Sequence, residues 1–331
     1  MTSLRRRISH AMIGVLLASG GLSAVTAQAG TLVRMDTTFG SLTLELYDDQ
    51  TPVSVENFLQ YLEKGAYSRG IVHRLDNDNQ VIQGGMIRYL GDCTEGVLIN
   101  CSTDWTQSDD PIKNESGIPN TRGTLAYART ADVDSATSQW FINTGDNPAF
   151  DNRIDEESGE PITGYAVFGR VLGDGMQVVD RITELETRML DQRLLPQFPM
   201  RDVTVPYPFE SSLVMYSMHE VERYTEALNV FEFQSGRLSL TADVAGTGPL
   251  SLQMVMVGTD PQPIFEVDQD TMVVMAFTPE GNGGFGHEAD PAILRVPTIE
   301  INENGTIYHM HNVVFRLIDE ARLRFQLISF E

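Results

Sequence analysis

The chain has 331 residues, of which 41% are hydrophobic and 21% are charged. This is enough material for two ordinary domains, and the composition is too apolar for a chain that is disordered throughout. Lys and Arg number 23 against 46 Asp and Glu, which gives a formal net charge of −23. Binding to nucleic acid or to an anionic membrane surface needs clustered Lys and Arg, so the charge argues against both kinds of partner. We therefore expect a folded, soluble, acidic protein.

The first 29 residues have the three features of a secretory signal peptide. Arg5-Arg6-Arg7 forms a charged head, an apolar run follows over residues 11–22, and Ala27-Gln28-Ala29 provides a small-x-small cleavage site. The apolar run is too short to span a bilayer stably, which makes a membrane anchor the weaker alternative. The three arginines leave the twin-arginine export route open. We expect cleavage after Ala29 and a mature protein in the periplasm, without membrane insertion.

Cys93 and Cys101 are the two cysteines of the chain. In an oxidising compartment, two cysteines this close in sequence can pair and close a short loop. Two free thiols are the alternative, and a metal site is weaker because no His lies near them in the sequence. The sequence therefore predicts a local disulfide, and we expect no metal ion and no cofactor.

The elements of the first half are predicted by periodicity. Residues 31–47 alternate apolar and polar side chains around a turn at residues 38–41, which predicts an opening β-hairpin. Thr51-Pro52 then starts a helix whose apolar residues recur until Gly65, and a second helix is predicted over residues 175–185. Short β-like segments lie between the helices. Two helices among many short strands favour a closed barrel over a parallel α/β sheet.

A boundary between two domains is predicted near Pro208. Four prolines surround Val203-Thr204-Val205, which we expect to be the last strand of the first domain. Residues 209–331 then hold about eight strand-like segments separated by turns, as is typical of a small antiparallel β-sandwich. The expected organisation is a signal peptide (1–29), a first domain (30–208) and a β-rich C-terminal domain of unknown function (209–331).

Three blocks of the first domain have an unusually specific sequence. They are Val72-His73-Arg74 with Gln80-Val81-Ile82-Gln83-Gly84-Gly85, Gly123-Thr124-Leu125-Ala126-Tyr127-Ala128-Arg129 with Ser135-Ala136-Thr137-Ser138-Gln139-Trp140-Phe141-Ile142-Asn143, and Tyr165-Ala166-Val167-Phe168-Gly169-Arg170-Val171. In order and spacing these blocks resemble the cyclophilins, the barrel-shaped peptidyl-prolyl isomerases, over roughly residues 31–205. The resemblance implies a mainly β fold, a closed eight-stranded β-barrel with two helices, and peptidyl-prolyl cis-trans isomerase activity of the bacterial exported type.

The chemistry of prolyl isomerisation explains why these residue types would occur together. Rotation about an X-Pro bond faces a barrier of roughly 18–20 kcal/mol, because the amide nitrogen shares its lone pair with the carbonyl. A fixed cation that donates a hydrogen bond to the proline nitrogen stabilises the twisted state, in which that lone pair is localised. Arg74 is the candidate cation, Gln83 the residue that orients it, and Phe141 the floor of a pocket for the proline ring. Taken singly, these three could be an ion-pair partner, a turn residue and a core aromatic.

The resemblance implies further residues around the pocket. Ala128 and Gln139 are expected to line the peptide groove, and Tyr165 to border it. Val81 and Phe150 are expected in the pocket wall, at positions where members of the family carry other residues.

Several departures from the family are grouped beside that wall. The turn that contains residues 75–79 is one residue longer and replaces a proline-glycine turn, and the usual Phe-Met pair becomes Gln80-Val81. Residues 151–163 form an additional acidic loop. Ala149 and Phe150 stand where some members of the family carry Trp and Leu, which puts cyclosporin binding in doubt. We therefore expect an altered pocket, with reduced activity or with a preference for another residue before proline.

The sequence thus predicts an extracytoplasmic peptidyl-prolyl isomerase that assists the folding of exported proteins, with proline-containing polypeptides as clients. The C-terminal domain would hold clients or position the enzyme. The alternative from another class is a non-catalytic module that binds proline peptides on a cyclophilin frame.

Overall fold

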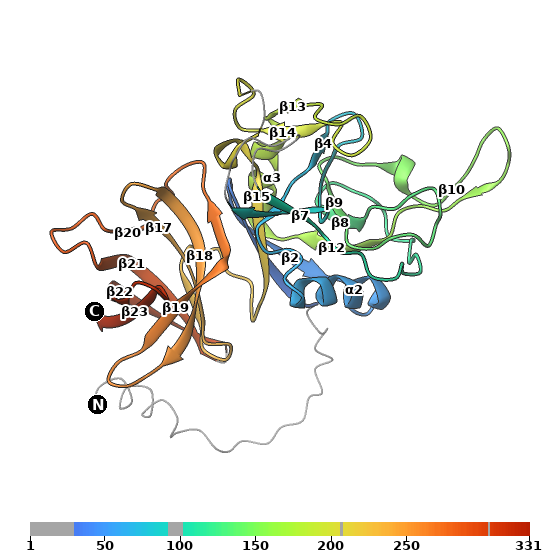
Figure 1. The fold of residues 1–331 in the computed structure, drawn as a ribbon. Coiled ribbons are helices and arrows are strands. Elements are labelled where there is room, and N and C mark those ends of the chain that lie inside the picture. Colours follow the sequence, from blue (N-terminus) through green and yellow to red (C-terminus); the bar gives the residue numbers. More distant parts are fainter. Residues whose placement is uncertain (1–29, 92–101, 206–207, 304) are drawn as a thin grey trace, which may run out of the picture.

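The computed structural model describes residues 30–91, 102–205, 208–303 and 305–331. The predicted signal peptide and the predicted Cys93–Cys101 pair lie outside the described residues. Most of the strands of the described chain belong to two β-sheets of different size, which lie side by side in Figure 1. No helix among the described residues has the length and apolar character that a membrane span requires.

The first sheet has eleven strands in the order β4-β5-β9-β8-β12-β2-β1-β15-β3-β6-β7. Their bounds are β1 Leu32–Thr37, β2 Gly40–Leu46, β3 Gly70–Ile71, β4 Arg74–Asp76, β5 Val81–Gly84, β6 Ile87–Gly91, β7 Ser102–Trp105, β8 Thr124–Tyr127, β9 Trp140–Asn143, β12 Val167–Val171 and β15 Met215–Val221. Two small hairpins complete this half, β10 Arg153–Ile154 with β11 Pro161–Ile162, and β13 Glu186–Arg188 with β14 Phe198–Met200.

The predicted hairpin and both predicted helices are confirmed. β1 pairs with β2 from Leu32↔Glu45 to Thr37↔Gly40, and Gly40 has a φ of 121°, which glycine adopts without strain. The helices are α2 Pro52–Glu63, with its proline in the first turn, and α3 Met176–Thr183. Their apolar faces pack onto the core of the first sheet.

One short segment links β5 with the chain next to β15, although five strands lie between the two in the strand order. Val72 donates its amide to the carbonyl of Val214 next to β15, at 2.9 Å, and His73 donates its amide to the carbonyl of Gln83 in β5, at 3.1 Å. Residues 70–76 therefore bond to β15 at one end and to β5 at the other. These bonds agree with the closed eight-stranded barrel that the resemblance implies, while the barrel as such stays a prediction.

The end of the first unit differs from the sequence-based expectation. Residues 203–205 form no strand, and the last strand of the first sheet is β15. β15 pairs with β1 along its whole length, from Thr37↔Tyr216 to Leu32↔Val221, and also with β3. The first unit therefore extends past the predicted boundary at Pro208 to Val221. Tyr216 and Met218 pack into the core of that unit, which is the physical reason for the difference.

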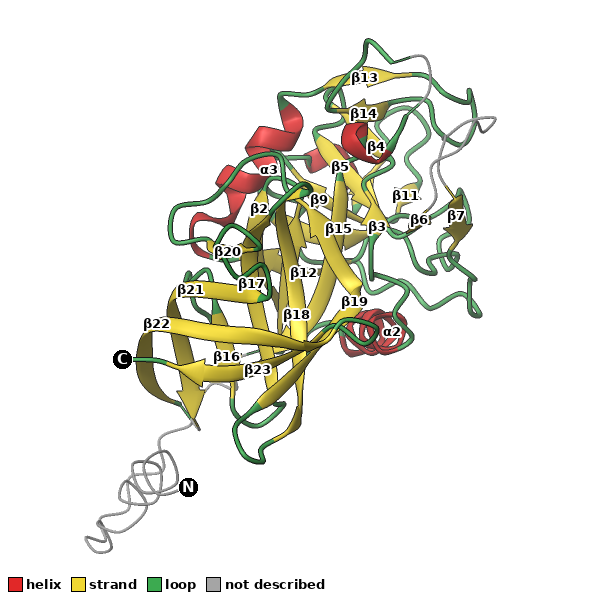
Figure 2. Cartoon of the chain, turned by 60° about the vertical axis from the view of Figure 1, so that its left-hand side comes forward, coloured by secondary structure: helices red, strands yellow, loops and turns green. Residues whose placement is uncertain are grey.

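The second sheet has eight strands in the order β16-β17-β18-β19-β23-β22-β21-β20. Their bounds are β16 Val230–Glu232, β17 Arg237–Val244, β18 Gly248–Gly258, β19 Ile264–Val274, β20 Gly283–Phe285, β21 Ile293–Glu303, β22 Thr306–Asp319 and β23 Arg324–Ser329. Additional parallel pairings of β16 with β21 and of β17 with β20 join its two ends (Figure 2). The β-rich C-terminal unit is thus confirmed, and the predicted sandwich takes the form of one sheet that folds back around its own core.

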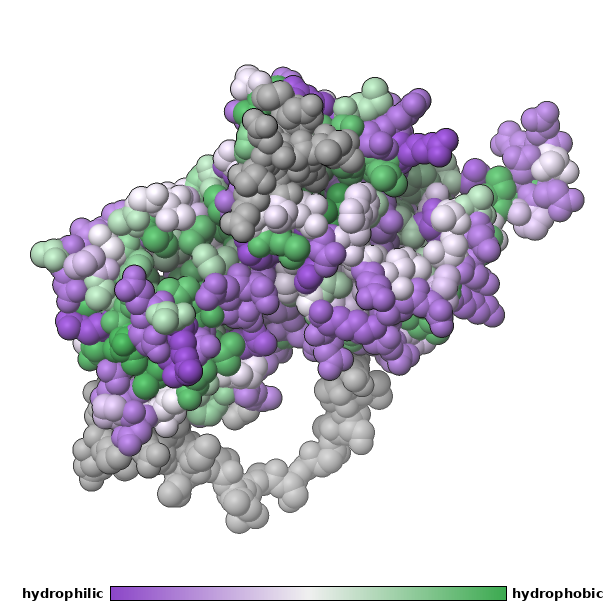
Figure 3. Space-filling view, in the orientation of Figure 1, coloured by the Kyte–Doolittle hydropathy of each residue, from purple (hydrophilic) through white to green (hydrophobic). Residues whose placement is uncertain are grey.

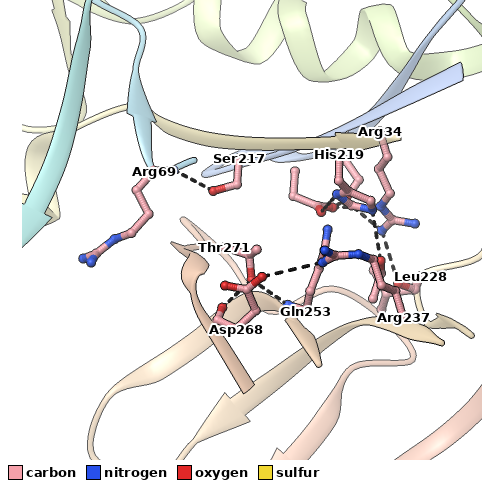
Figure 4. Close-up of polar contacts among 12 residues, drawn as sticks. Arg34, Arg69, Ser217, His219, Leu228, Arg237, Gln253, Asp268 and Thr271 are labelled. Carbon is pink, nitrogen blue, oxygen red and sulfur yellow. Dashed lines mark hydrogen bonds and ion pairs between the residues drawn. The ribbon is translucent and has the colours of Figure 1, made fainter. Parts of the chain in front are cut away.

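The two units meet across the outer faces of β1 and β15 (Figure 4). Val33 and Met35 point into the first core, so the alternating Arg34 and Asp36 point outward, yet they are buried because the second unit covers them. Arg34 donates to the carbonyls of Ala227 and Leu228, at 3.2 and 3.3 Å.

Two further bonds cross the same boundary. The amide of Ala276, just after β19, donates to the carbonyl of Thr38 at 2.7 Å. The Nε2 atom of His219 in β15 lies 3.2 Å from the Oγ atom of Ser239 in β17. The second unit is therefore hydrogen-bonded to the first through strands of both sheets.

Candidate functional site

The strand register places three of the predicted site residues in one row. Arg74 in β4 is paired with Gln83 in β5, Gln83 is paired with Phe141 in β9, and Phe141 is paired with Ala126 in β8. Directly paired residues project from the same face of a sheet. The alternating neighbours Leu75, Ile82 and Ile142 belong to the core of the first unit, so the row lies on the outer face.

Arg74 is held by three acceptors. Its Nε atom donates to Oε1 of Gln197 at 3.1 Å, and its Nη1 atom donates to Oε1 of Gln83 at 3.4 Å. Its Nη2 atom donates to Oδ2 of Asp76, with which it forms an ion pair. The side chain of Arg74 remains 34% exposed, whereas that of Asp76 is 3% exposed. The guanidinium is thus fixed on one side and open to solvent on the other.

Gln83 connects this cation to the next strand. Gln83 is buried, and its Nε2 atom donates to Oε1 of Gln139 at 2.8 Å. The carbonyl of Gln139 in turn accepts the amide of Ala128 at 2.9 Å. The structure therefore brings together four predicted residues, Arg74, Gln83, Gln139 and Ala128, along one hydrogen-bonded path.

An apolar cluster lies at the other end of the row. Val81, Ala126, Phe141 and Val167 form its buried part, and the half-buried residues packed against them are Tyr47, Ile118, Ala128, Phe150 and Tyr165. The ring of Phe141 meets those of Phe150 and Tyr165 edge to face, with centroids 5.8 and 5.6 Å apart. Such ring contacts are favourable in themselves and fix the shape of an apolar cavity wall. The predicted residues Val81, Phe141, Phe150 and Tyr165 therefore do lie together.

Gln80 does not belong to that wall, although the sequence analysis grouped it with Val81. Gln80 is exposed, has a φ of 52°, and follows the lengthened turn. Its side chain lies over Gly145, where an added Cβ atom would come within 2.2 Å of Oε1 of Gln80. The side chain of Gln80 therefore lies against Gly145, and of this pair only Val81 belongs to the apolar cluster around Phe141.

Three residues near the site were not predicted as functional. Asp76 and Gln197 bond to Arg74, and Arg129 lies with its guanidinium carbon 4.7 Å from the ring centroid of Tyr165 and donates to the carbonyl of Thr163 at 2.6 Å. Asp76 could have been found, because it stands two residues after Arg74 and so projects from the same face of a strand.

The acidic loop forms an arm beside the pocket. Its hairpin, β10 with β11, projects from the first unit, and its tip is hydrophilic in Figure 3. Asp155 accepts the amide and the hydroxyl of Ser158, at 2.8 and 2.7 Å, which closes the turn at the tip. The arm begins next to Phe150 and returns next to Tyr165, whose amide donates to the carbonyl of Phe150 at 2.9 Å.

His73 and Asp76, the ionisable groups beside Arg74, each have a single protonation state at pH 7. Burial, together with the positive charge of Arg74, lowers the pKa of His73 to about 3, so this imidazole is neutral at pH 7. Burial alone would raise the pKa of Asp76, but hydrogen bonds from Asn79 and the charge of Arg74 outweigh it and keep the pKa below its usual value. Asp76 is therefore ionised at pH 7. Within the described residues, no group of three or more His, Cys, Asp or Glu could hold a metal ion.

This arrangement can bind an apolar ring and direct N–H donors at it. The pocket offers one fixed cation, amide groups and aromatic walls. Such groups stabilise a change in charge distribution without forming a bond to the substrate.

Comparison with known proteins gives consistent matches over this region. A family model described as "Cyclophilin type peptidyl-prolyl cis-trans isomerase/CLD" matches residues 32–205. A peptidyl-prolyl cis-trans isomerase of Acinetobacter baylyi is 39% identical over 194 residues, which cover 57% of this chain and 92% of that protein. Peptidyl-prolyl cis-trans isomerase A of Dickeya dadantii is 38% identical over 188 residues, with coverages of 56% and 87%. Isomerase B of Escherichia coli is 39% identical over 160 residues, with coverages of 47% and 86%.

Proposed function

The chain belongs to the cyclophilin-type peptidyl-prolyl cis-trans isomerases, and we propose that it isomerises X-Pro bonds of polypeptides with Arg74 as the catalytic residue. The row of Arg74, Gln83 and Phe141 carries this proposal. It places a fixed N–H donor beside the apolar cluster around Phe141, which supports binding of a proline ring there. No cofactor is needed, because the reaction makes and breaks no covalent bond.

Catalysis follows from what the guanidinium favours. In the planar amide the proline nitrogen shares its lone pair with the carbonyl and accepts a hydrogen bond poorly. In the twisted state the lone pair is localised, and an N–H of Arg74 can donate to it. Because this bond forms only in the twisted state, it lowers the barrier without strengthening ground-state binding. Phe141 and Val81 hold the ring in both states and so contribute mainly to affinity.

The test is turnover of a proline tetrapeptide in a protease-free assay. We expect Arg74→Ala to lower kcat by about 10²–10³, as when a single charged or polar donor to a transition state is lost. Arg74→Lys is the control, because it keeps the positive charge and removes the planar group of donors. Unchanged turnover in Arg74→Ala would contradict the assignment of the catalytic residue.

A second candidate function is a binding module for proline segments without useful turnover. The ion pair of Arg74 with Asp76 favours it, because the carboxylate engages part of the guanidinium and offsets its charge. The same assay separates the two functions. Tight binding of a proline peptide together with equal rates of isomerisation with and without protein would support the module.

We also propose that the protein works in the periplasm on exported clients. The charged head, apolar run and cleavage site of residues 1–29 support this, and β1 begins only three residues after Ala29. Protein isolated from a periplasmic fraction should have Gly30 as its first residue. Protein that retains residues 1–29 and stays in the cytoplasm would contradict export.

A further inference from the structure

Three side chains bond to the guanidinium of Arg74, and two of them, Asp76 and Gln197, are not among the predicted site residues. Gln83 lies directly opposite it in the register, whereas Asp76 comes from its own strand and Gln197 from a segment 123 residues away. We propose that Asp76 and Gln197 are positioning residues that fix the orientation of Arg74 for the X-Pro bond. This inference rests on the proposed function and extends it to two residues outside the three sequence blocks.

Hydrogen bonds to both oxygen atoms hold the carboxylate of Asp76 in one orientation. Its Oδ1 atom accepts the amides of Asp78 and Asn79, at 3.1 and 3.0 Å, and its Oδ2 atom accepts the side-chain amide of Asn79 at 2.7 Å. The same Oδ2 atom accepts Nη2 of Arg74. The lengthened turn therefore fixes the carboxylate, and the carboxylate fixes one edge of the guanidinium.

Gln197 is fixed by its backbone as well as by its side chain. The amide of Leu75 in β4 donates to the carbonyl of Gln197 at 2.9 Å, which ties this residue to the strand that carries Arg74. The next residue, Phe198, is fully buried and begins β14. Gln197 accepts Nε of Arg74 and also bonds to the side chain of Asp76, so it bridges the two charged groups.

The three bonds leave a defined part of the guanidinium for substrate. Arg has five N–H donors in one plane. Three of them point at Gln197, Gln83 and Asp76, which leaves two donors on a side chain that is 34% exposed. A donor that is already oriented needs no further ordering, with its loss of entropy, when the substrate reaches its twisted state. Loss of either partner should therefore reduce kcat more than it changes KM.

A double-mutant cycle on the full-length protein tests this. We expect Asp76→Asn and Gln197→Leu each to lower kcat about tenfold with KM changed less than about twofold. Introduced into Arg74→Ala, the same substitutions should lower kcat no further, because they act through a guanidinium that is absent. A purely structural role would instead lower the melting temperature equally in both backgrounds and leave kcat unchanged below it.

Asp191→Asn is the matched control. Asp191 also closes a turn, since its Oδ1 atom accepts the amides of Arg193 and Leu194 at 2.8 Å each, and it precedes Gln197 in the same connection between β13 and β14. The variant Asp191→Asn should lower the melting temperature as Asp76→Asn does, but it should leave kcat unchanged. Equal losses of kcat in Asp191→Asn and Gln197→Leu would overturn the proposal.

A second measurement does not depend on turnover. The Nε proton of Arg74, assigned by its absence from the NMR spectrum of Arg74→Ala, should exchange slowly with solvent in the parent and at least about tenfold faster in Gln197→Leu. If the parent does not isomerise the peptide, the proposed function fails and this exchange rate alone decides whether Gln197 orients Arg74. Equal exchange rates in the parent and Gln197→Leu would overturn the positioning role, whatever the activity.

Discussion

Val81 is one of the residues at which the apolar cluster departs from the wall expected of its family. It is buried beside Phe141. We expect an apolar wall to contact a proline ring in the planar and in the twisted state alike and so to contribute uniform binding. This separates the role expected of Val81 from the one proposed for Arg74, which acts in the twisted state alone.

Truncation of this wall gives a prediction about binding. Val81→Ala should raise KM severalfold and leave kcat within about twofold, because removal of uniform binding leaves the chemical step unchanged. Steady-state kinetics with one proline tetrapeptide measures both. Val55→Ala is the control: Val55 is also 3% exposed, but it lies in α2 and packs into the core of the first unit. A fall in kcat in Val81→Ala, with KM unchanged, would show that Val81 acts in the twisted state.

The resemblance to the cyclophilins was sufficient to find Arg74, Gln83 and Phe141, and the strand pairing places these three residues in one row on one face. Gln80 was misplaced because it follows a turn whose length differs from that of the family, and the side-chain directions at such a turn do not follow from the resemblance. Gln197 could not be found, since nothing local indicates that it returns to β4.

At the scale of elements, β15 decides where the first unit ends. Its sequence alternates apolar residues in the same way as the strands that follow it, so periodicity alone assigned it to the C-terminal domain. Only pairing with β1 and β3 shows which sheet it completes. Local pattern thus predicts that a strand exists, while its partner depends on contacts that are distant in sequence.

Two fragments test this assignment. Residues 30–221 should fold and isomerise a tetrapeptide at a rate close to that of the full chain, because the second unit supplies no residue of the pocket cluster. Residues 30–208 lack β15, which leaves the edge of β1 unpaired and removes Tyr216 and Met218 from the core. Circular dichroism of purified fragments measures the difference. A folded, active 30–208 fragment would restore the boundary near Pro208.

At the scale of the whole molecule, a buried polar layer joins the two units. Arg34 and His219 project from the first sheet, and Arg237 projects from the second (Figure 4). Asp36 bonds to Arg34, and Ser239 of the second sheet bonds to His219. The Nε atom of Arg34 donates to Oδ1 of Asp36 at 2.9 Å, and both side chains are less than a tenth exposed. Arg34, Asp36 and His219 are therefore ionisable groups that water reaches only when the units separate or unfold.

His219 makes the stability of this layer depend on pH. Burial lowers the pKa of His219 to about 4; Asp36 opposes the shift, and Arg34 and Arg237 add to it. An unfolded His titrates near 6.5. Between pH 6.5 and 4 the unfolded chain therefore binds more protons than the folded one, and the free energy of unfolding falls as the pH is lowered through this range.

The size of this effect can be measured by urea unfolding at pH 7 and pH 5. His219 should account for about 2 kcal/mol of the loss between these two values, from the linkage between protonation and unfolding. The variant His219→Gln keeps a group that can bond to Ser239 but does not titrate, so its loss should be smaller by that amount. His309→Gln is the control for the loss of an imidazole as such, because the side chain of His309 is 51% exposed. The pKa of His73 is also lowered, to about 3, so His73 likewise makes the free energy of unfolding fall as the pH is lowered. This contribution is the same in the parent and in the variants, so it cancels when they are compared. An identical loss in the parent and His219→Gln would mean that His219 is not buried at the boundary between the two units.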